Sequence, residues 1–359
     1  MVRETFVAKE KSSTGKPGSA VSKYSYIRAI SCIAIIALHT VFSSLLVYQK
    51  GLTELQIMGS RIMVNNLMWA VPCFFMVSGA LLLDRRREMP YKKLFTKYIG
   101  KMLLVILIFT LIYSISDMFL NGQPGFGLAL LQGIYKAFTD TSWSHMWYLY
   151  TLIGIYLMLP LYKKMIQGCT EKDIWYLLAI FFIFLSLFPL LEMFGVSFGV
   201  KIPAATIYPF WFFLGYALKG QDRGRAVPAV FFSVGTLGLI LFTILRWTLP
   251  MEGMEQLFAY SSPVVILQAM GLYLLLYSIP VHKKSWLHKA LVWIDRRSFG
   301  IYLVHLIFIR WGLRFFHINP YGLGVGSPLY LALFVFGVLV LSGVVVFILQ
   351  KIPGVNKLI

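Results

Sequence analysis

The sequence predicts an all-α membrane protein with about ten transmembrane helices and both termini in the cytoplasm. Of its 359 residues, 58% are hydrophobic and only 13% are charged, and the mean hydropathy is +0.75. Soluble domains are about 45–50% apolar and about 25% charged. In addition, apolar runs of about 20 residues, the length that crosses a bilayer, recur along the chain. These observations exclude an ordinary soluble domain.

Ten apolar runs can be followed in order, and each predicts one spanning helix. They cover residues 24–48, 62–83, 99–120, 146–162, 175–191, 204–218, 226–247, 262–279, 299–313 and 329–349. The run at 299–313 is short and is flanked by arginines. We therefore expect one membrane domain at 24–350, between a polar basic tail (1–23) that lacks the apolar core of a signal peptide and a short C-terminus (351–359).

The connecting loops alternate in charge, and this alternation orients the chain. The basic segments are the N-terminal tail, 84–101, 163–172, 219–225, 282–297 and 351–357, whereas 50–61, 121–144, 192–201, 250–260 and 316–327 carry few cations. Because Lys and Arg concentrate in cytoplasmic loops, both termini are predicted to be cytoplasmic, as an even number of spans requires. The segment 121–144 contains Asn-Gly-Gln-Pro-Gly-Phe-Gly and is predicted to be a turn-rich surface loop.

The formal net charge of +19 does not indicate a nucleic-acid-binding protein. The cations lie in short loops between apolar runs, where they set topology and contact anionic membrane lipid. Cys32 and Cys73 fall inside predicted spans and Cys169 in a basic loop, so three cysteines form no disulfide framework. No Cys/His spacing indicates zinc, and no metal is expected.

The first run carries two ionisable side chains, Arg28 near its start and His39 in its middle. Eleven residues at about 100° each return to the same helix face, about 16 Å further along the axis. An ionisable group inside a span is costly and is therefore a functional candidate. A surface cation above a buried imidazole suits a ligand with an anionic head and a reactive tail, such as an acyl-coenzyme A. Two alternatives remain: Arg28 as a topological anchor, and His39 as a polar group bonded to a neighbouring helix.

Four short motifs follow one another along the chain. They are Arg28 with His39, the segment 71–79 (Val-Pro-Cys-Phe-Phe-Met-Val-Ser-Gly), the segment 145–149 (His-Met-Trp-Tyr-Leu) followed by Tyr-Leu-Met-Leu-Pro at 156–160, and the segment 298–305 (Ser-Phe-Gly-Ile-Tyr-Leu-Val-His). In these residues and their order the chain resembles the acyltransferase 3 family of integral membrane O-acyltransferases. The likeness is to short members without an esterase-like domain, similar to those acting on enterobacterial common antigen or intercellular adhesin polysaccharide.

The resemblance implies transfer of an acyl group, usually acetyl, from cytoplasmic acyl-CoA to a hydroxyl of a cell-envelope glycan or lipid-linked sugar. It also implies a bacterial plasma membrane and acetyl-CoA as donor substrate. His39 would act as general base on the hydroxyl or handle the acyl group. Arg28 would pair with the phosphates of coenzyme A. Succinyl or another short acyl group remains open.

Two departures from the family pattern concern the donor side. Met68 and Trp69 stand where several relatives carry an arginine, with Arg61 two turns earlier. The Arg-x-x-Arg that often enters the third span is absent, and Lys97 and Lys101 are the nearest basic residues. Lysine holds a phosphate as a point charge, without the bidentate fork of arginine.

Further candidates fall into two groups. The donor candidates are Arg85, Arg86, Lys93, Lys97 and Lys101, although topology and lipid contact are the simpler explanation of the basic cluster to which they belong. The acceptor-side or supporting candidates are His145, Trp147, Ser298, Tyr302 and His305. An interfacial aromatic belt would also explain His145 and Trp147. The last three candidates lie at i, i+4 and i+7, one helical face that interhelical hydrogen bonding would also explain.

A polysaccharide exporter or other multi-span transporter is the alternative function. Intramembrane charges fit it, but the sequence shows no inverted repeats or paired broken helices. A carrier would also not need a base placed a coenzyme A arm's length from a cation. A nonenzymatic scaffold has little support, and the unrelated membrane-bound O-acyltransferases differ in length and in the context of their histidine and asparagine.

Overall fold

The computed structural model describes residues 17–122, 125–139, 143–196, 198–202, 204–221 and 224–359, so most of the predicted basic tail lies outside the described residues. Within this part every regular element is a helix and there is no strand. The α-helices are Pro17–Tyr48 (α2), Glu54–Asn66 (α3), Ala70–Leu82 (α4), Tyr91–Lys93 (α5), Gly100–Asn121 (α6), Phe126–Thr139 (α7), Trp147–Gly168 (α8), Glu171–Phe182 (α9), Phe188–Glu192 (α10), Tyr208–Ala217 (α11), Ala226–Thr248 (α12), Pro263–Tyr277 (α13), Trp286–Asp295 (α14), Ser298–Arg314 (α15) and Ser327–Leu349 (α16).

Short helices complete the bundle. Two π-helical segments are Leu94–Ile99 (η2) and Ile183–Leu187 (η4), and the 3₁₀ turns are Gln49–Gly51 (η1), Ser144–Met146 (η3), Met254–Phe258 (η5), Gly324–Gly326 (η6) and Val355–Lys357 (η7). The predicted all-α class is confirmed.

Eight helical stretches in the described part are long and apolar enough to cross a membrane. The other two predicted spans, 204–218 and 299–313, correspond to α11 and α15, which have 10 and 17 residues. Because about 20 residues cross a bilayer, α11 is half the required length and α15 lies at the lower limit. A multi-pass membrane fold is therefore supported, while the count of ten stays a prediction.

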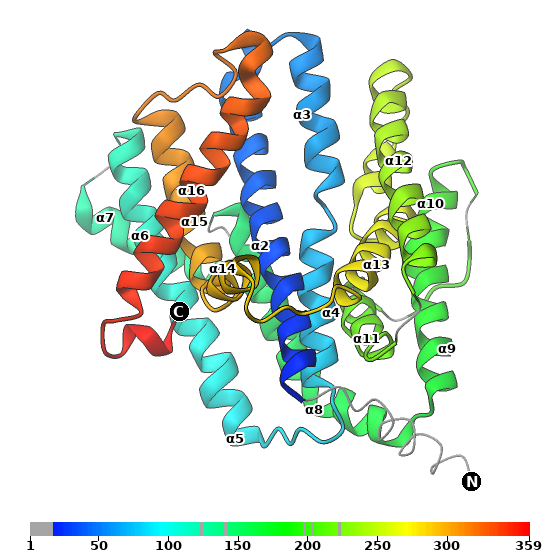
Figure 1. Cartoon of the computed structure of the whole chain (residues 1–359). Coiled ribbons are helices and arrows are strands. Elements are labelled where there is room, and N and C mark those ends of the chain that lie inside the picture. Colours follow the sequence, from blue (N-terminus) through cyan, green and yellow to red (C-terminus); the bar gives the residue numbers. More distant parts are fainter. Residues whose placement is uncertain (1–16, 123–124, 140–142, 197, 203, 222–223) are drawn as a thin grey trace.

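Helix α2 runs through the centre of the bundle (Figure 1) and contacts α3, α4, α13, α14, α15 and α16. Its apolar residues face neighbours on several sides, as the full burial of Ile27, Ala29 and Ile36 shows. A helix that is apolar all round is stable only inside a bundle or in lipid. Arg28 and His39 are consequently held within the protein by the helices packed around α2.

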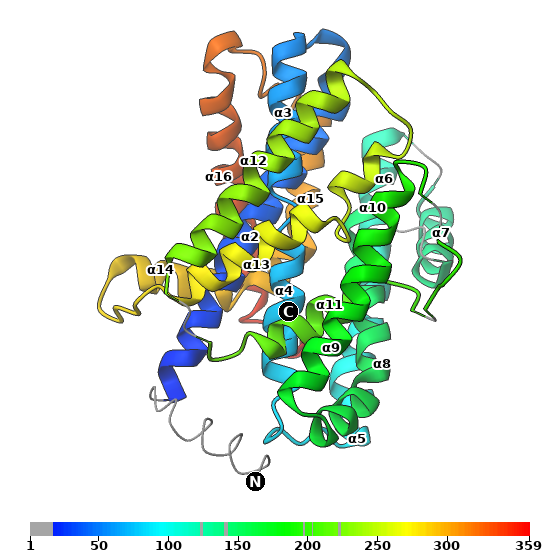
Figure 2. The same cartoon turned by 90° about the vertical axis from the view of Figure 1, so that its right-hand side faces the viewer.

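Two segments predicted as loops contain helices, so the prediction of a turn-rich loop at 121–144 is wrong for most of its length. There α7 buries Ala129, Gly133 and Ala137, one residue per turn, and packs on α6. In the predicted basic loop 282–297, α14 lies at the left side of the bundle in Figure 2 and packs on α2. These segments were predicted as loops because Gly, Pro and Lys residues lie at their ends. The apolar residues in their middle nevertheless recur with the period of a helix.

The second predicted span begins earlier than expected and is broken. Helix α3 starts with a capping box, in which Thr53 and Gln56 bond each other's backbone N–H groups. Between α3 and α4 the chain leaves the helix at residues 67–69. Pro72 explains the break, because its ring lacks an N–H and clashes with the carbonyl four residues earlier.

Helices α4 and α11 cross at two glycines. A Cβ on Gly79 would lie 1.8 Å from the carbonyl oxygen of Phe212, and one on Gly215 would lie 1.9 Å from that of Met76. The two backbones therefore touch directly, as small residues allow in membrane bundles. This crossing fixes α4, whose Phe74 and Ser78 line the cavity described below.

Asp84 joins three helices at the end of the bundle where α2 begins. Lys219 pairs with its carboxylate, and the Nζ of Lys163 donates to the carbonyls of Leu82 and Asp84 at 3.3 and 2.8 Å. Burial raises the pKa of Asp84, but hydrogen bonds from Lys219 and Arg86 outweigh it and lower the pKa to about 2. Some cations of the basic loops thus hold helix ends together.

Candidate active site

A cavity of about 210 Å³ lies alongside α2, between α4, α6, α8 and α15. Its wall is mainly apolar and aromatic, as in many small-molecule sites. Seven of the predicted site residues line it: Arg28, His39, His145, Trp147, Ser298, Tyr302 and His305. The structure therefore gathers the residues predicted for the chemistry and for the acceptor side around one space, although they come from three separate parts of the chain.

His39 is fixed by a second histidine. The Nδ1 of His39 lies 2.8 Å from the Nε2 of His305, which is fully buried. On its other side the Nδ1 of His305 lies 3.1 Å from the carbonyl oxygen of Ile301 and 2.7 Å from that of Tyr302. A carbonyl only accepts, so this nitrogen of His305 must carry the proton.

This chain of hydrogen bonds determines the tautomers of the neutral rings. With its proton on Nδ1, His305 has a lone pair on Nε2 and accepts from the Nδ1–H of His39. The lone pair of His39 is then on Nε2, the nitrogen that is left for a ligand in the cavity. A histidine oriented in this way is the usual arrangement of a general base.

His145 offers a second lone pair. The hydroxyl of Tyr113 donates to the carbonyl of Leu303, so it accepts from the Nε2 of His145 at 3.1 Å. The remaining Nδ1 of His145 is buried and has no hydrogen-bond partner among the described residues. His145 is only 2% exposed, so it is part of the interior and does not belong to an exposed aromatic belt.

The turn from α14 to α15 positions the side chains at the end of the cavity where Arg28 lies. Ser298, the first residue of α15, donates to the carbonyl of Asp295 at 2.9 Å. The Asp295 carboxylate accepts two hydrogen bonds from Arg28, from Nε at 2.6 Å and from Nη2 at 2.9 Å. Arg28 therefore lies at the cavity with its guanidinium plane fixed, and its Nη1 is the donor atom outside this bidentate pair.

A family model described as an acyltransferase domain matches residues 22–347 of the chain. The chain belongs to the acyltransferase 3 family. The resemblance found in the four motifs is confirmed over nearly the whole length, whereas the likeness to its short members stays a prediction. No curated protein and no solved structure matches the chain.

The basic candidates of this acyltransferase lie elsewhere. Arg85, Arg86, Lys93, Lys97 and Lys101 are not among the described residues that line the cavity. Arg85 donates to the carbonyl of Cys169 at 2.6 Å, and Arg86 pairs with Asp84. The ammonium of Lys101 lies 5.2 Å from the ring centre of Phe299, a residue that lines the cavity.

Sequence reasoning missed several residues that shape this acyltransferase site. Asp295, which binds Arg28, is an acidic residue in an otherwise basic loop, and this contrast was the available signal. Tyr113, which bonds His145, and the lining residue Tyr260 carry no such signal, because tyrosines are common throughout the chain. Among the described residues, no three His, Cys, Asp or Glu side chains are arranged to hold a metal ion.

Proposed function

We propose that this membrane acyltransferase moves an acyl group, acetyl first, from cytoplasmic acyl-CoA to a hydroxyl of a cell-envelope glycan or lipid-linked sugar. The observation that carries the proposal is the hydrogen-bonded series His39, His305 and backbone carbonyl, which leaves the Nε2 of His39 as a base beside the cavity that it lines. Such a base suits proton removal from a hydroxyl that attacks a thioester.

The proposed reaction conserves atoms and protons. The Nε2 of His39 takes the proton of the acceptor hydroxyl as its oxygen bonds to the thioester carbonyl carbon. The carbon–sulfur bond then breaks, and the proton on His39 passes to the departing sulfur. The products are the O-acyl sugar and free coenzyme A, and His39 returns to its starting form.

Each substrate would enter from its own end of the cavity. Arg28 lies about 16 Å below His39 along α2, a separation that suits the arm between the phosphates and the thioester of coenzyme A. Lys101 and the other basic candidates would add charge on this side. The Nδ1 of His145 would accept a hydrogen bond from a second hydroxyl of the sugar and so orient the sugar.

This assignment of ends follows the charge pattern of the loops. We place the protein in a bacterial plasma membrane with both termini in the cytoplasm, so that the end with Arg28 faces the cytoplasmic acyl-CoA. The sugar would then approach from the opposite side.

The first test is release of free thiol from acetyl-CoA by the purified protein in lipid nanodiscs, with and without an envelope lipid extract. We expect His39→Gln to lower the rate by about 10²–10⁴-fold, because it removes the base. His305→Leu should lower it by roughly 10–100-fold, since His39 loses its orienting partner, and His305→Gln should recover part of that loss because its amide oxygen accepts the same hydrogen bond.

His282→Gln is the matched control, because His282 is exposed in a loop outside the cavity. Equal rates in wild type and His39→Gln would refute the role of His39. A protein that neither binds nor cleaves acetyl-CoA, but moves glycan across vesicle membranes, would instead establish the exporter alternative.

A further inference from the structure

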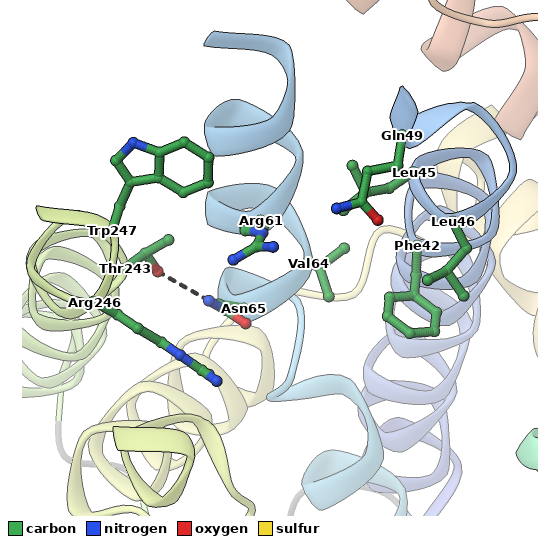
Figure 3. A pocket seen from close by; sticks show the side chains of 10 residues that line it. All are labelled: Phe42, Leu45, Leu46, Gln49, Arg61, Val64, Asn65, Thr243, Arg246 and Trp247. Atoms are coloured by element: carbon green, nitrogen blue, oxygen red, sulfur yellow. Dashed lines mark hydrogen bonds between the residues drawn. The ribbon is translucent and has the colours of Figure 1, made fainter. Parts of the chain in front are cut away.

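A second cavity, of about 270 Å³, lies at the other end of α2. Figure 3 shows it between the last turns of α2, the second half of α3 and the last turns of α12. It shares no lining residue with the candidate active site. We call it the arginine cavity, because Arg61 and Arg246 both project into it from different helices.

These two arginines differ from the other arginines on this side of the bundle. Arg310 forms an ion pair with Asp117 at 2.8 Å, and Arg314 donates to Asn121 at 3.0 Å. In the part of the chain that the structure describes, neither Arg61 nor Arg246 has an Asp or Glu within ion-pair distance. Two guanidinium groups therefore face the same cavity without a carboxylate to balance their charge, and an anionic ligand would supply that balance.

Aromatic rings hold the two guanidinium groups in place. Arg61 lies 5.4 Å from the ring centre of Trp247, and Arg246 lies 5.7 Å from that of Phe258. Such contacts orient a guanidinium and leave its N–H groups available for a ligand. On the proposed topology this end is non-cytoplasmic, where Lys and Arg are scarce, so topology does not account for the pair.

On the α2 side the wall of this cavity is apolar, with Phe42, Leu45 and Leu46. Phe42 and Leu46 on α2 line the cavity and are 44% and 60% exposed, although α2 is a membrane helix. Asn65 donates to Thr243 at 2.9 Å and closes the inner side. A free anion would need no such apolar flank, whereas a phosphate on a long apolar chain needs both parts of this wall.

The two cavities follow one another along α2. Leu38 lines the candidate active site, and Phe42, one turn later, lines the arginine cavity. Leu45, another lining residue, is six residues beyond His39, which corresponds to about 9 Å along the helix axis. Along the axis of α2, the residues that line the two cavities are thus separated by about the length of a sugar.

We propose that the arginine cavity binds the phosphate of a phosphate ester carried by a membrane-embedded apolar chain. We further assign this ester as the carrier of the sugar that is acylated, an assignment that rests on the proposed function. Arg61 and Arg246 hold the phosphate oxygens, the exposed face of α2 lies along the chain, and the sugar extends towards His39.

Native mass spectrometry of the protein in a neutral detergent tests the binding, with decaprenyl phosphate as the probe. Decaprenol tests the need for phosphate, and inorganic phosphate tests the need for the chain. We expect Arg61→Gln and Arg246→Gln each to weaken decaprenyl phosphate binding by about tenfold, because each removes charge-assisted hydrogen bonds. Arg61→Lys should retain part of the affinity, since it keeps the charge.

Lys50→Gln is the matched control, because Lys50 is an exposed cation at the same end that does not line the cavity. Unchanged binding in both arginine variants would overturn the proposal, as would equal binding of decaprenol. Displacement of the probe by inorganic phosphate at equal concentration would assign the site to a free anion instead. Thermal melting of each variant shows that it is folded.

The same variants separate this site from the proposed function. Thiol release from acetyl-CoA without acceptor should be unchanged in Arg61→Gln, whereas KM for a lipid-linked sugar should rise. Arginine-dependent probe binding in a protein that never cleaves acetyl-CoA would support the phosphate site and refute the acyltransfer. If cleavage depends on His39 but probe binding is the same in both arginine variants, the acyltransfer is supported and the phosphate site is refuted.

Discussion

At the scale of residues, hydrogen bonds determine which ring nitrogen of each histidine in the candidate site carries a proton and which carries a lone pair. Two backbone carbonyls force the proton of His305 onto Nδ1, and this tautomer forces the proton of His39 onto its own Nδ1. Tyr113 acts in the same way on His145. The positions of the nitrogen lone pairs of these two lining histidines are thus determined by neighbouring hydrogen-bonding groups, as they are in other active sites.

The pair of Arg28 and Asp295 is expected to be important for stability as well as for the donor. Asp295 is 7% exposed and Arg28 is 27% exposed, so loss of one partner leaves a poorly hydrated charge. We expect Arg28→Ala to lower the free energy of unfolding by about 3 kcal/mol, the lower end for a buried pair because Arg28 is partly hydrated. Chemical denaturation in detergent measures the change.

A double-mutant cycle isolates this interaction. The variant Arg28→Ala with Asp295→Ala should be more stable than the sum of the single changes predicts, with a coupling energy of about 1–3 kcal/mol. Strict additivity would show that the two side chains contribute independently.

At the scale of elements, the short helix α15 supplies most of one wall of the cavity. Ser298, Tyr302 and His305 lie on the single face that their spacing predicts, and all three line the cavity. Tyr302 also donates to the backbone carbonyl of His145 and joins α15 to the start of α8. This face of α15 therefore both lines the cavity and forms an interhelical hydrogen bond.

The crossing of α4 and α11 should be intolerant of any added side-chain atom. Gly79→Ala would place its Cβ 1.8 Å from the carbonyl oxygen of Phe212, so the helices must separate. We expect a loss of about 1–3 kcal/mol, the usual cost of overpacking, measured as a lower melting temperature in detergent. Activity should fall with it, because α4 carries Phe74 and Ser78 into the cavity.

Gly154→Ala on α8 is the control for this prediction. A Cβ on Gly154 would have no other atom within 4 Å, so the change should be neutral or slightly stabilising through the higher helix propensity of alanine. Equal melting temperatures for the two variants would contradict a tight crossing at Gly79.

At the scale of the whole molecule, the two cavities follow the central helix from one end of the bundle to the other. The end where α2 begins also holds the basic segment around α5 and the Asp84 contacts, whereas the last turns of α2 and α12 lie at the opposite end (Figure 1). This polarity would let an acyl donor and a lipid-borne acceptor approach one base from opposite faces of the membrane.

Labelling of single cysteines in intact cells tests this orientation, with Cys169 replaced by serine and the buried Cys32 and Cys73 retained. We expect a membrane-impermeant maleimide to react with Glu252→Cys from outside and with Glu88→Cys only after permeabilisation, because both residues are exposed and they lie in loops at opposite ends. The opposite pattern would invert the proposed topology.

Much of this protein was predictable from local sequence. The apolar runs predicted the all-α membrane class, and the eleven-residue spacing predicted that Arg28 and His39 share one helix face, from which both line the cavity. The α7 and α14 helices were missed because their ends resemble loops. Asp295 and Tyr113 were missed because their partners are distant in the sequence, at Arg28 and His145.

The sequence by itself determined the membrane class, because that depends on composition and on the length of apolar runs, and its four short motifs pointed to the family. Only the tertiary structure decided which nitrogen of His39 is free, which acid binds Arg28, and that Arg61 and Arg246 share one cavity. The physical reason is that hydrogen bonds and charge pairs form between helices, and the packing of α2 against its neighbours decides which side chains meet.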